Sequence, residues 1–218
     1  MALRRMLSLI FLLALMVPSA HAQKGFELTP FGGSRFGGVI DLSSSGGPFD
    51  YVTIKSSADY GVIADYTLWD NFQPEFMWNR QPTMLATHDY ATGIRTDLTS
   101  ANLDMFQFGF VYSLRSPEAR LKPFFVGGLG FSHFGYANPS AAAEVLDFSN
   151  RFSYNLGIGA KYFFNRYVGL RLEGRWSPSR TTTAPAQYCS PYYGCYTTNV
   201  TNHAEQGQVN IGIIVRFK

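Results

Sequence analysis

The chain has 218 residues, of which 16% are aromatic and 15% charged, and its formal net charge at pH 7 is +3. This length suits a single domain, and a charge so close to zero leaves no net field to attract nucleic acid. Beyond residue 22, no apolar stretch approaches the roughly 20 residues of a membrane-spanning helix, which excludes a helical membrane protein.

The N-terminus carries the pattern of a secretory signal peptide. Two arginines precede an apolar run at residues 6–17, and a proline and small residues follow that run. The run is too short to span a membrane, and a small-residue cleavage site comes after it. We expect cleavage after Ala22, which divides the chain into a signal peptide, 1–22, and a mature domain, 23–218. The mature domain holds 16 basic and 15 acidic residues.

Most of the mature chain alternates between apolar and polar residues. Successive side chains of a strand point to opposite faces, so this alternation predicts strands with one apolar face. The apolar faces of five such segments are Tyr60, Val62, Ala64, Tyr66 and Leu68; Phe76 and Trp78; Phe106, Phe108, Phe110, Tyr112 and Leu114; Phe152, Tyr154, Leu156, Ile158, Ala160 and Tyr162; and Val168, Leu170, Leu172, Gly174 and Trp176.

Two further segments have a less regular pattern. The first runs from Phe26 to Phe36, and its alternation slips at residues 30–33, which indicates a β-bulge. The glycine-rich run 121–134 predicts a strand, but its sequence does not say which side chains share a face.

The last segment has the clearest alternation. Its apolar positions are Val209, Ile211, Ile213, Val215 and Phe217. The other face accepts an amide at Asn210, a glycine at Gly212 and a guanidinium at Arg216. One apolar face and one polar face are typical of a closed barrel in a membrane, with lipid outside and a polar lumen inside.

The eight segments are joined by connections that alternate in length. Short connections are expected at 69–73, 115–120 and 164–166, and long ones at 40–57, 82–102, 135–150 and 178–206. Lipid cannot satisfy an open sheet edge, so the sheet must close. The sequence therefore predicts an all-β fold, an eight-stranded antiparallel up-and-down transmembrane β-barrel, with both chain ends on the side of the short turns.

Two motifs carry a resemblance to a known family. The stretch from Lys122 to Gly130 is similar to the lysine-proline-aromatic, glycine-rich strand of the OmpA/OmpX-like eight-stranded barrels. The C-terminal strand resembles the sorting signal of barrel precursors, with matching residues at Asn210, Gly212, Val215 and Phe217. The resemblance implies a location in the outer membrane of a Gram-negative-type bacterium, contact with membrane lipid and lipopolysaccharide, and insertion by the barrel assembly machinery.

The expected interior face carries both signs of charge. Its charged residues are Asp65, Glu75, Lys161, Arg171, Glu173, Arg175 and Arg216. Side chains nearly fill the interior of an eight-stranded barrel, and an unpaired buried ion costs several kcal/mol. We therefore expect a structural network of ion pairs that plugs the lumen. A narrow ion path, and a catalytic carboxylate pair formed by Glu75 and Glu173, are the alternatives.

The last long connection contains both cysteines, Cys189 and Cys195. A proline and a glycine between them allow a tight reversal, and the exported compartment is oxidising, so we expect a disulfide that holds the loop tip. A metal or redox pair is the alternative. The loop is also rich in tyrosine, which suits either a partner-binding surface or the membrane–water interface.

These observations favour a structural or surface-interaction protein that uses four long loops and needs no cofactor and no catalysis. One alternative is an enzyme that modifies lipid A or phospholipid. Its best candidates, Ser132 and His133, are neighbours in a strand and therefore point to opposite faces. A narrow diffusion pore is another alternative. A soluble ligand-binding barrel fits less well, because glycines crowd the polar face as they would in a narrow lumen.

Overall fold

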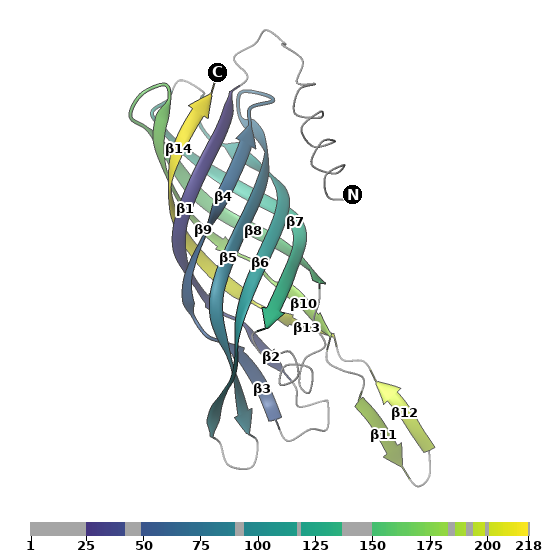
Figure 1. The fold of residues 1–218 in the computed structure, drawn as a ribbon. Helices are drawn as coiled ribbons and strands as arrows, with labels where there is room; N and C mark the ends of the chain where they lie inside the picture. The colour runs from purple at the N-terminus through teal and green to yellow at the C-terminus, as the bar shows by residue number, and fades with distance from the viewer. Residues whose placement is uncertain are drawn as a thin grey trace, which may run out of the picture.

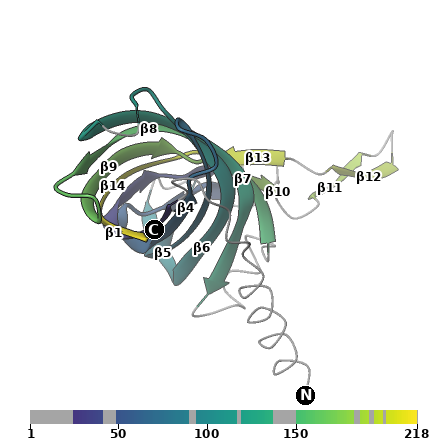
Figure 2. The ribbon, with the colours of Figure 1, turned by 90° about the horizontal axis from the view of Figure 1, so that it is seen from above.

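The computed structural model describes residues 25–41, 49–89, 94–116, 119–136, 150–182, 186–190, 194–198 and 201–217. Eight strands form the barrel: β1 (Phe26–Gly37), β4 (Ser57–Tyr66), β5 (Phe72–Asp89), β6 (Arg95–Ser113), β7 (Leu121–Tyr136), β8 (Asn150–Phe163), β9 (Val168–Trp176) and β14 (Gln206–Phe217). Each pairs antiparallel with the next, and β14 pairs with β1 to close the ring (Figures 1 and 2). The predicted fold class is confirmed.

The barrel has two different ends. Short connections join β4 to β5, β6 to β7 and β8 to β9 at the end where β1 begins and β14 finishes, and we call this the turn end. At the opposite end, the loop end, lie β2 (Val39–Asp41) and β3 (Phe49–Ile54), together with β10 (Ser179–Thr182), β11 (Ala186–Ser190), β12 (Gly194–Thr198) and β13 (Thr201–Ala204) (Figure 1). The expected signal peptide, 1–22, lies outside the described residues.

The expected bulge in the first strand is wrong. The register of β1 is unbroken against both β4 and β14. The apparent slip in the sequence arises because Phe31 points into the barrel, where Gly61 and Gly212 lie opposite it on the two neighbouring strands. The ring packs against Ile63 and Met77, and a Cβ atom at Gly212 would lie only 2.9 Å from the Cβ atom of Phe31. An apolar residue on the interior face therefore resembled a change of register.

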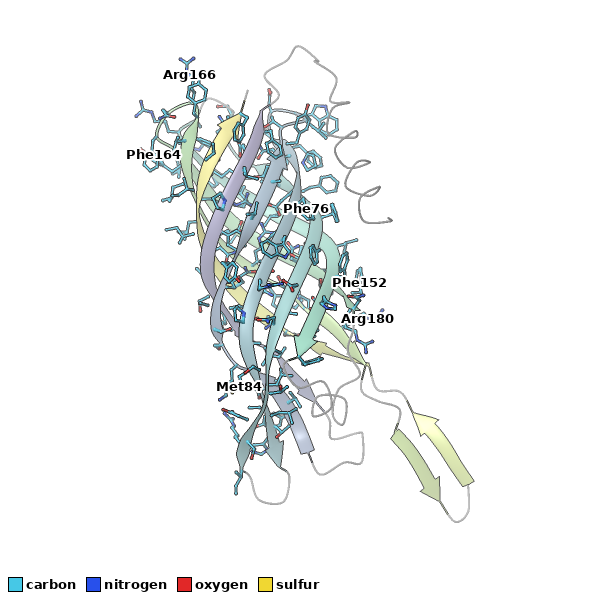
Figure 3. All side chains as sticks on the ribbon, in the orientation of Figure 1. Phe76, Met84, Phe152, Phe164, Arg166 and Arg180 are labelled. Atoms are coloured by element: carbon cyan, nitrogen blue, oxygen red, sulfur yellow. The ribbon has the colours of Figure 1, made fainter. Side chains whose placement is uncertain are left out.

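The expected long loop at 82–102 is also wrong. Strands β5 and β6 stay paired from Phe72 opposite Tyr112 to His88 opposite Arg95, with one irregularity at residues 85–86. Strand β3 adds to the outer part of β5, so this end of the wall is a sheet rather than a loop. The paired strands project beyond the other six barrel strands at the loop end, where Figure 3 labels Met84.

The wall separates an apolar outer face from a mixed interior. Strand β7, whose facing the sequence did not reveal, turns Lys122 and Phe124 inward and Phe125 and Leu129 outward. Outward aromatic rings contact each other across strands, as in Phe106 and Phe131, whose centroids are 5.2 Å apart. Figure 3 shows side chains such as Phe76 and Phe152 on the outside of this wall. No helix among the described residues is long and apolar enough to cross a membrane.

Candidate functional site

The interior of the turn half holds a network of ion pairs, and Lys161 is one of its two hubs. This residue projects inward from β8, and its ammonium donates to Glu27 at 2.7 Å, Asp65 at 2.8 Å and Gln73 at 2.8 Å. An ammonium has three protons to donate, so all of them are used. The three acceptors lie on β1, β4 and β5, so a single side chain ties β8 to the far wall of the barrel.

The second hub consists of two guanidinium groups from β9. Arg171 donates to Asp65 at 2.8 Å, Glu75 at 2.5 Å and Glu173 at 2.7 Å. Arg175 holds two of the same carboxylates, with its shortest contacts to Glu75 and Glu173 both at 2.8 Å. The planar fork of arginine suits such multiple pairing with carboxylates. All five side chains are buried, so each ion depends on its partners rather than on water.

Glu27 is the member of the network that the predicted set lacks. It accepts from Lys161 and also from Arg216, whose guanidinium approaches Oε1 to 2.6 Å. With Glu27 included, four carboxylates face four basic groups. The sequence held the necessary signal, because Glu27 lies between Phe26 and Leu28 and therefore has the parity of the interior face.

Toward the loop half, amide side chains replace most of the ions. Asn210 donates to Glu173 at 3.2 Å and accepts from Gln208 at 2.9 Å. Gln208 also donates to Asp59 and accepts from Arg35 at 2.8 Å. Asn210 therefore joins the ionic network to a layer of amides with a single buried arginine.

An apolar cluster closes the interior near the loop end. It consists of Val52, Ile54, Leu85, Ala101, Leu103, Met105, Phe134 and Ala204. Val52 and Ile54 come from β3, which folds against β5 and fills the space inside the projecting wall. Arg35 contacts the sulfur of Met105, so the amide layer meets this cluster directly. Described side chains thus occupy the lumen in three successive layers: ionic, amide and apolar.

The catalytic alternatives find little geometric support. Ser132 points inward to a hydrogen bond with Ser179 at 2.9 Å, whereas His133 points outward to Asn150 at 2.9 Å. The carboxylates of Glu75 and Glu173 are both engaged by arginines. Within the described ranges, no group of three or more histidine, cysteine, aspartate or glutamate side chains is placed to hold a metal ion.

The cysteines lie opposite each other in backbone register, Cys189 on β11 and Cys195 on β12. Their side chains are outside the described part of the chain, so the disulfide stays a prediction.

The residues of the expected sorting signal divide between the two faces of β14. Asn210 and Gly212 face the interior, while Val215 and Phe217 face outward. Phe217 is opposite Phe26 where β14 closes onto β1, with the ring centroids 6.1 Å apart. Its place at this seam is a structural reason for an aromatic residue near the C-terminus.

Several solved structures resemble the fold of this chain. No curated protein sequence matches the chain. The solid-state NMR structure of outer membrane protein AlkL has a TM-score of 0.56 and 18% identity, covering 93% of this chain and 94% of that one. Neisserial surface protein A (NspA) has a TM-score of 0.52 and 10% identity, covering 90% and 100%.

A major outer membrane protein from Thermus thermophilus has a TM-score of 0.51 and 14% identity, covering 90% of this chain and 100% of that chain. Identities this low establish a shared fold and nothing more. A family model described as the outer membrane protein beta-barrel domain matches residues 8–217, nearly the whole sequence. The closed eight-stranded barrel and this match agree, and the chain belongs to the outer membrane protein beta-barrel domain family.

Proposed function

We propose that the protein is a non-catalytic barrel in the outer membrane of a Gram-negative-type bacterium, which presents its loop end to partners at the cell surface. In this orientation the turn end faces the periplasm, as short turns do in such barrels. Its partners in the membrane are lipid and lipopolysaccharide, and the barrel assembly machinery inserts it.

The filled lumen carries this proposal. A pore needs a continuous aqueous path, but ion pairs cross the turn half from wall to wall and an apolar cluster occupies the interior near the loop end. Opening a path through the network would leave buried charges without partners, at a cost of several kcal/mol per ion. The interior thus supports a role as an anchor rather than as a conduit.

The pattern of residues on the outer surface supports the proposed position of the membrane edge. One cross-strand row contains Val62, Trp78, Phe106, Phe131 and Phe152. The next row toward the loop end contains Tyr60, Arg80, Asp104 and His133, in which Arg80 and Asp104 form a bidentate pair at 2.8 Å. The change from an aromatic row to a charged row is expected where lipid gives way to head groups.

Beyond that boundary, the wall continues into a surface-exposed extension. From Arg80 to the end of β5 at Asp89, the strand advances about 30 Å at the usual rise per residue. The extension is stiffened by β3 and by the apolar cluster beneath it. A rigid platform of this kind holds its loops in place at low entropic cost, which favours binding of a partner.

Planar-bilayer recordings test the sealed interior. The reconstituted protein should give only small and rare conductance events. The matched measurement uses Glu173→Ala, which removes a carboxylate shared by two arginines and should raise the frequency of openings. A steady, large conductance of the unaltered protein would replace the anchor with a diffusion pore.

The orientation has its own test. Single cysteines at Asn102 and Asn165, in a background with both native cysteines changed to serine, mark the loop end and the turn end. On intact cells a membrane-impermeant maleimide should label the first variant and spare the second. The opposite labelling pattern, or recovery of the protein in the soluble periplasmic fraction, would contradict the proposal.

A further inference from the structure

The turn end contains a basic cavity that the ionic network does not fill. Its volume is about 430 Å³, within the range of ligand-binding pockets. Among the described residues that line it are five basic side chains, Arg120, Lys122, Lys161, Arg166 and Arg216, and two acidic ones, Glu27 and Asp70. Glu27 is already paired with Lys161 and Arg216, so it cannot neutralise the remaining cations.

Lys122 adds a positive charge to this cavity beside other basic residues of the sheet. It faces inward on β7, directly opposite Lys161 on β8, which in turn lies opposite Arg171 on β9. Like charges directly opposite each other in a sheet are destabilising. Lys161 and Arg171 are matched by carboxylates, whereas no ion pair joins Lys122 to a carboxylate of the described residues.

A second cation, Arg216, lies close to Lys122. Its ammonium lies 5.1 Å from the centre of the Phe163 ring, and the guanidinium carbon of Arg216 lies 3.9 Å from the same centre. One ring thus holds two cations at the wall of the cavity. Lys122 is 7% exposed, so water screens its charge poorly. A tetrahedral oxyanion accepts hydrogen bonds from several such donors at once.

We propose that the turn-end cavity is a phosphate-binding site, in which Lys122 and Arg216 hold one phosphate group and Arg120 and Arg166 complete the rim. The phosphate belongs either to free phosphate or to the head group of a phospholipid. Phe164 and Tyr167 flank Arg166 in the sequence and are exposed, as aromatic residues at a membrane–water interface are. Figure 3 shows Phe164 and Arg166 at the turn end. The cavity therefore lies at the level where lipid head groups are found.

The first arm of the test uses inorganic phosphate. The full-length barrel, folded in lauryldimethylamine oxide, is titrated with phosphate while backbone amide shifts are followed by NMR, with chloride at matched ionic strength as the reference. We expect saturable shifts at Lys122, Phe163 and Arg216 with phosphate alone. Lys122→Gln should weaken binding about tenfold or more, because it removes a charge-assisted hydrogen bond. Lys122→Arg should retain most of it.

The second arm uses lipid. The barrel is taken from nanodiscs that contain phosphatidylglycerol, and retained lipid is counted by native mass spectrometry. A lipid kept by the unaltered protein and lost in Lys122→Gln assigns the site to a head group. Saturable phosphate shifts with equal lipid retention assign it to free phosphate. The matched control is Lys55→Gln, which alters an exposed lysine paired with Asp97 at the loop end.

Heat-modifiable mobility on a gel verifies that each variant is folded. If Lys122→Gln does not fold, Arg120→Gln takes its place, because Arg120 is exposed at the rim and folding does not depend on its burial. Equal responses to phosphate and chloride, together with equal lipid retention by unaltered and variant protein, would overturn the proposal. Neither arm measures conductance or the labelling of intact cells, so this result is distinguishable from a failure of the proposed function.

Discussion

The interiors of the two halves of the barrel are filled by different kinds of side chain. In the turn half, carboxylates from β1, β4, β5 and β9 meet basic groups from β8, β9 and β14. In the loop half, β3 and the outer parts of β5 and β6 supply an apolar cluster. In the proposed orientation, the turn half lies within the lipid-facing band and the loop half extends beyond the charged row at Arg80 and Asp104.

The arrangement of the strands in each half determines which side chains can fill its interior. In the turn half the interior positions belong to wall strands, so charged side chains find partners on their own strand, on the neighbouring strand or, as Lys161 does, across the lumen. In the loop half an additional strand, β3, enters beside the wall and brings its own apolar residues, as an ordinary protein core does. Removing one ion leaves its partners buried without a counter-charge. Truncating one apolar side chain removes only the contacts of that side chain. The two halves should therefore respond differently to deletion.

The largest effect is expected from Glu173→Ala. The substitution leaves Arg171 and Arg175 buried with one carboxylate fewer, which costs about 3–5 kcal/mol for a broken buried pair. Glu173→Gln should be milder, because it keeps the shape and one acceptor oxygen. The urea midpoint of unfolding measures both. Equal midpoints for the two variants would mean that shape, rather than charge, holds the turn half together.

A smaller loss is expected from Leu103→Ala in the apolar cluster. Leu103 is fully buried, and such a truncation removes its contacts and leaves a cavity, at a cost of about 2–4 kcal/mol. Leu129→Ala is the matched control, since Leu129 is 59% exposed on the outer face. The same urea titration applies. Comparable losses at both positions would show that the cluster does not act as a core.

Phe217→Ala should affect assembly more than stability. The ring contacts Phe26 at the seam of the barrel, and an aromatic pair contributes only about 0.5–1.5 kcal/mol beyond burial. As the aromatic residue of the expected sorting signal, however, it should control how much folded, heat-modifiable protein accumulates in cells. Deletion of Lys218 provides the comparison. If the two variants accumulate equally, the assignment of the signal is wrong.

The smallest effect on the barrel is expected from replacing Cys189 and Cys195 by serine. The bond would close a short loop, which stabilises that loop by at most about 2–3 kcal/mol. Strands β11 and β12 form a separate two-stranded sheet, so the barrel should keep its strand content and its urea midpoint. Mass spectrometry of the non-reduced peptide tests the bond itself. Loss of the folded band would contradict an independent loop tip.

The facing of most strands could be predicted from the sequence by itself, because the period of a strand is two and lipid demands an apolar outer face. The same reasoning selected seven charged residues, of which six are buried in the interior and the seventh, Arg216, is partly exposed at the turn end. It missed Glu27, although this residue has the parity of the interior face. It also took Phe31 for a change of register, because the two glycines opposite this residue lie on other strands.

The ion pairs between distant strands depend on the tertiary structure, unlike the pairs of Glu173 with Arg171 and Arg175, which are two residues apart on β9. Lys161 contacts Glu27 and Asp65 across 134 and 96 positions of sequence, and no local pattern encodes such pairs. The extension of β5 and β6 was also hidden, because its apolar residues, such as Leu85 and Leu103, face the interior, whereas polar residues such as Asn102 lie on its outer face. Local alternation determines which face of the wall a side chain occupies, while barrel closure and register determine which other side chains it contacts.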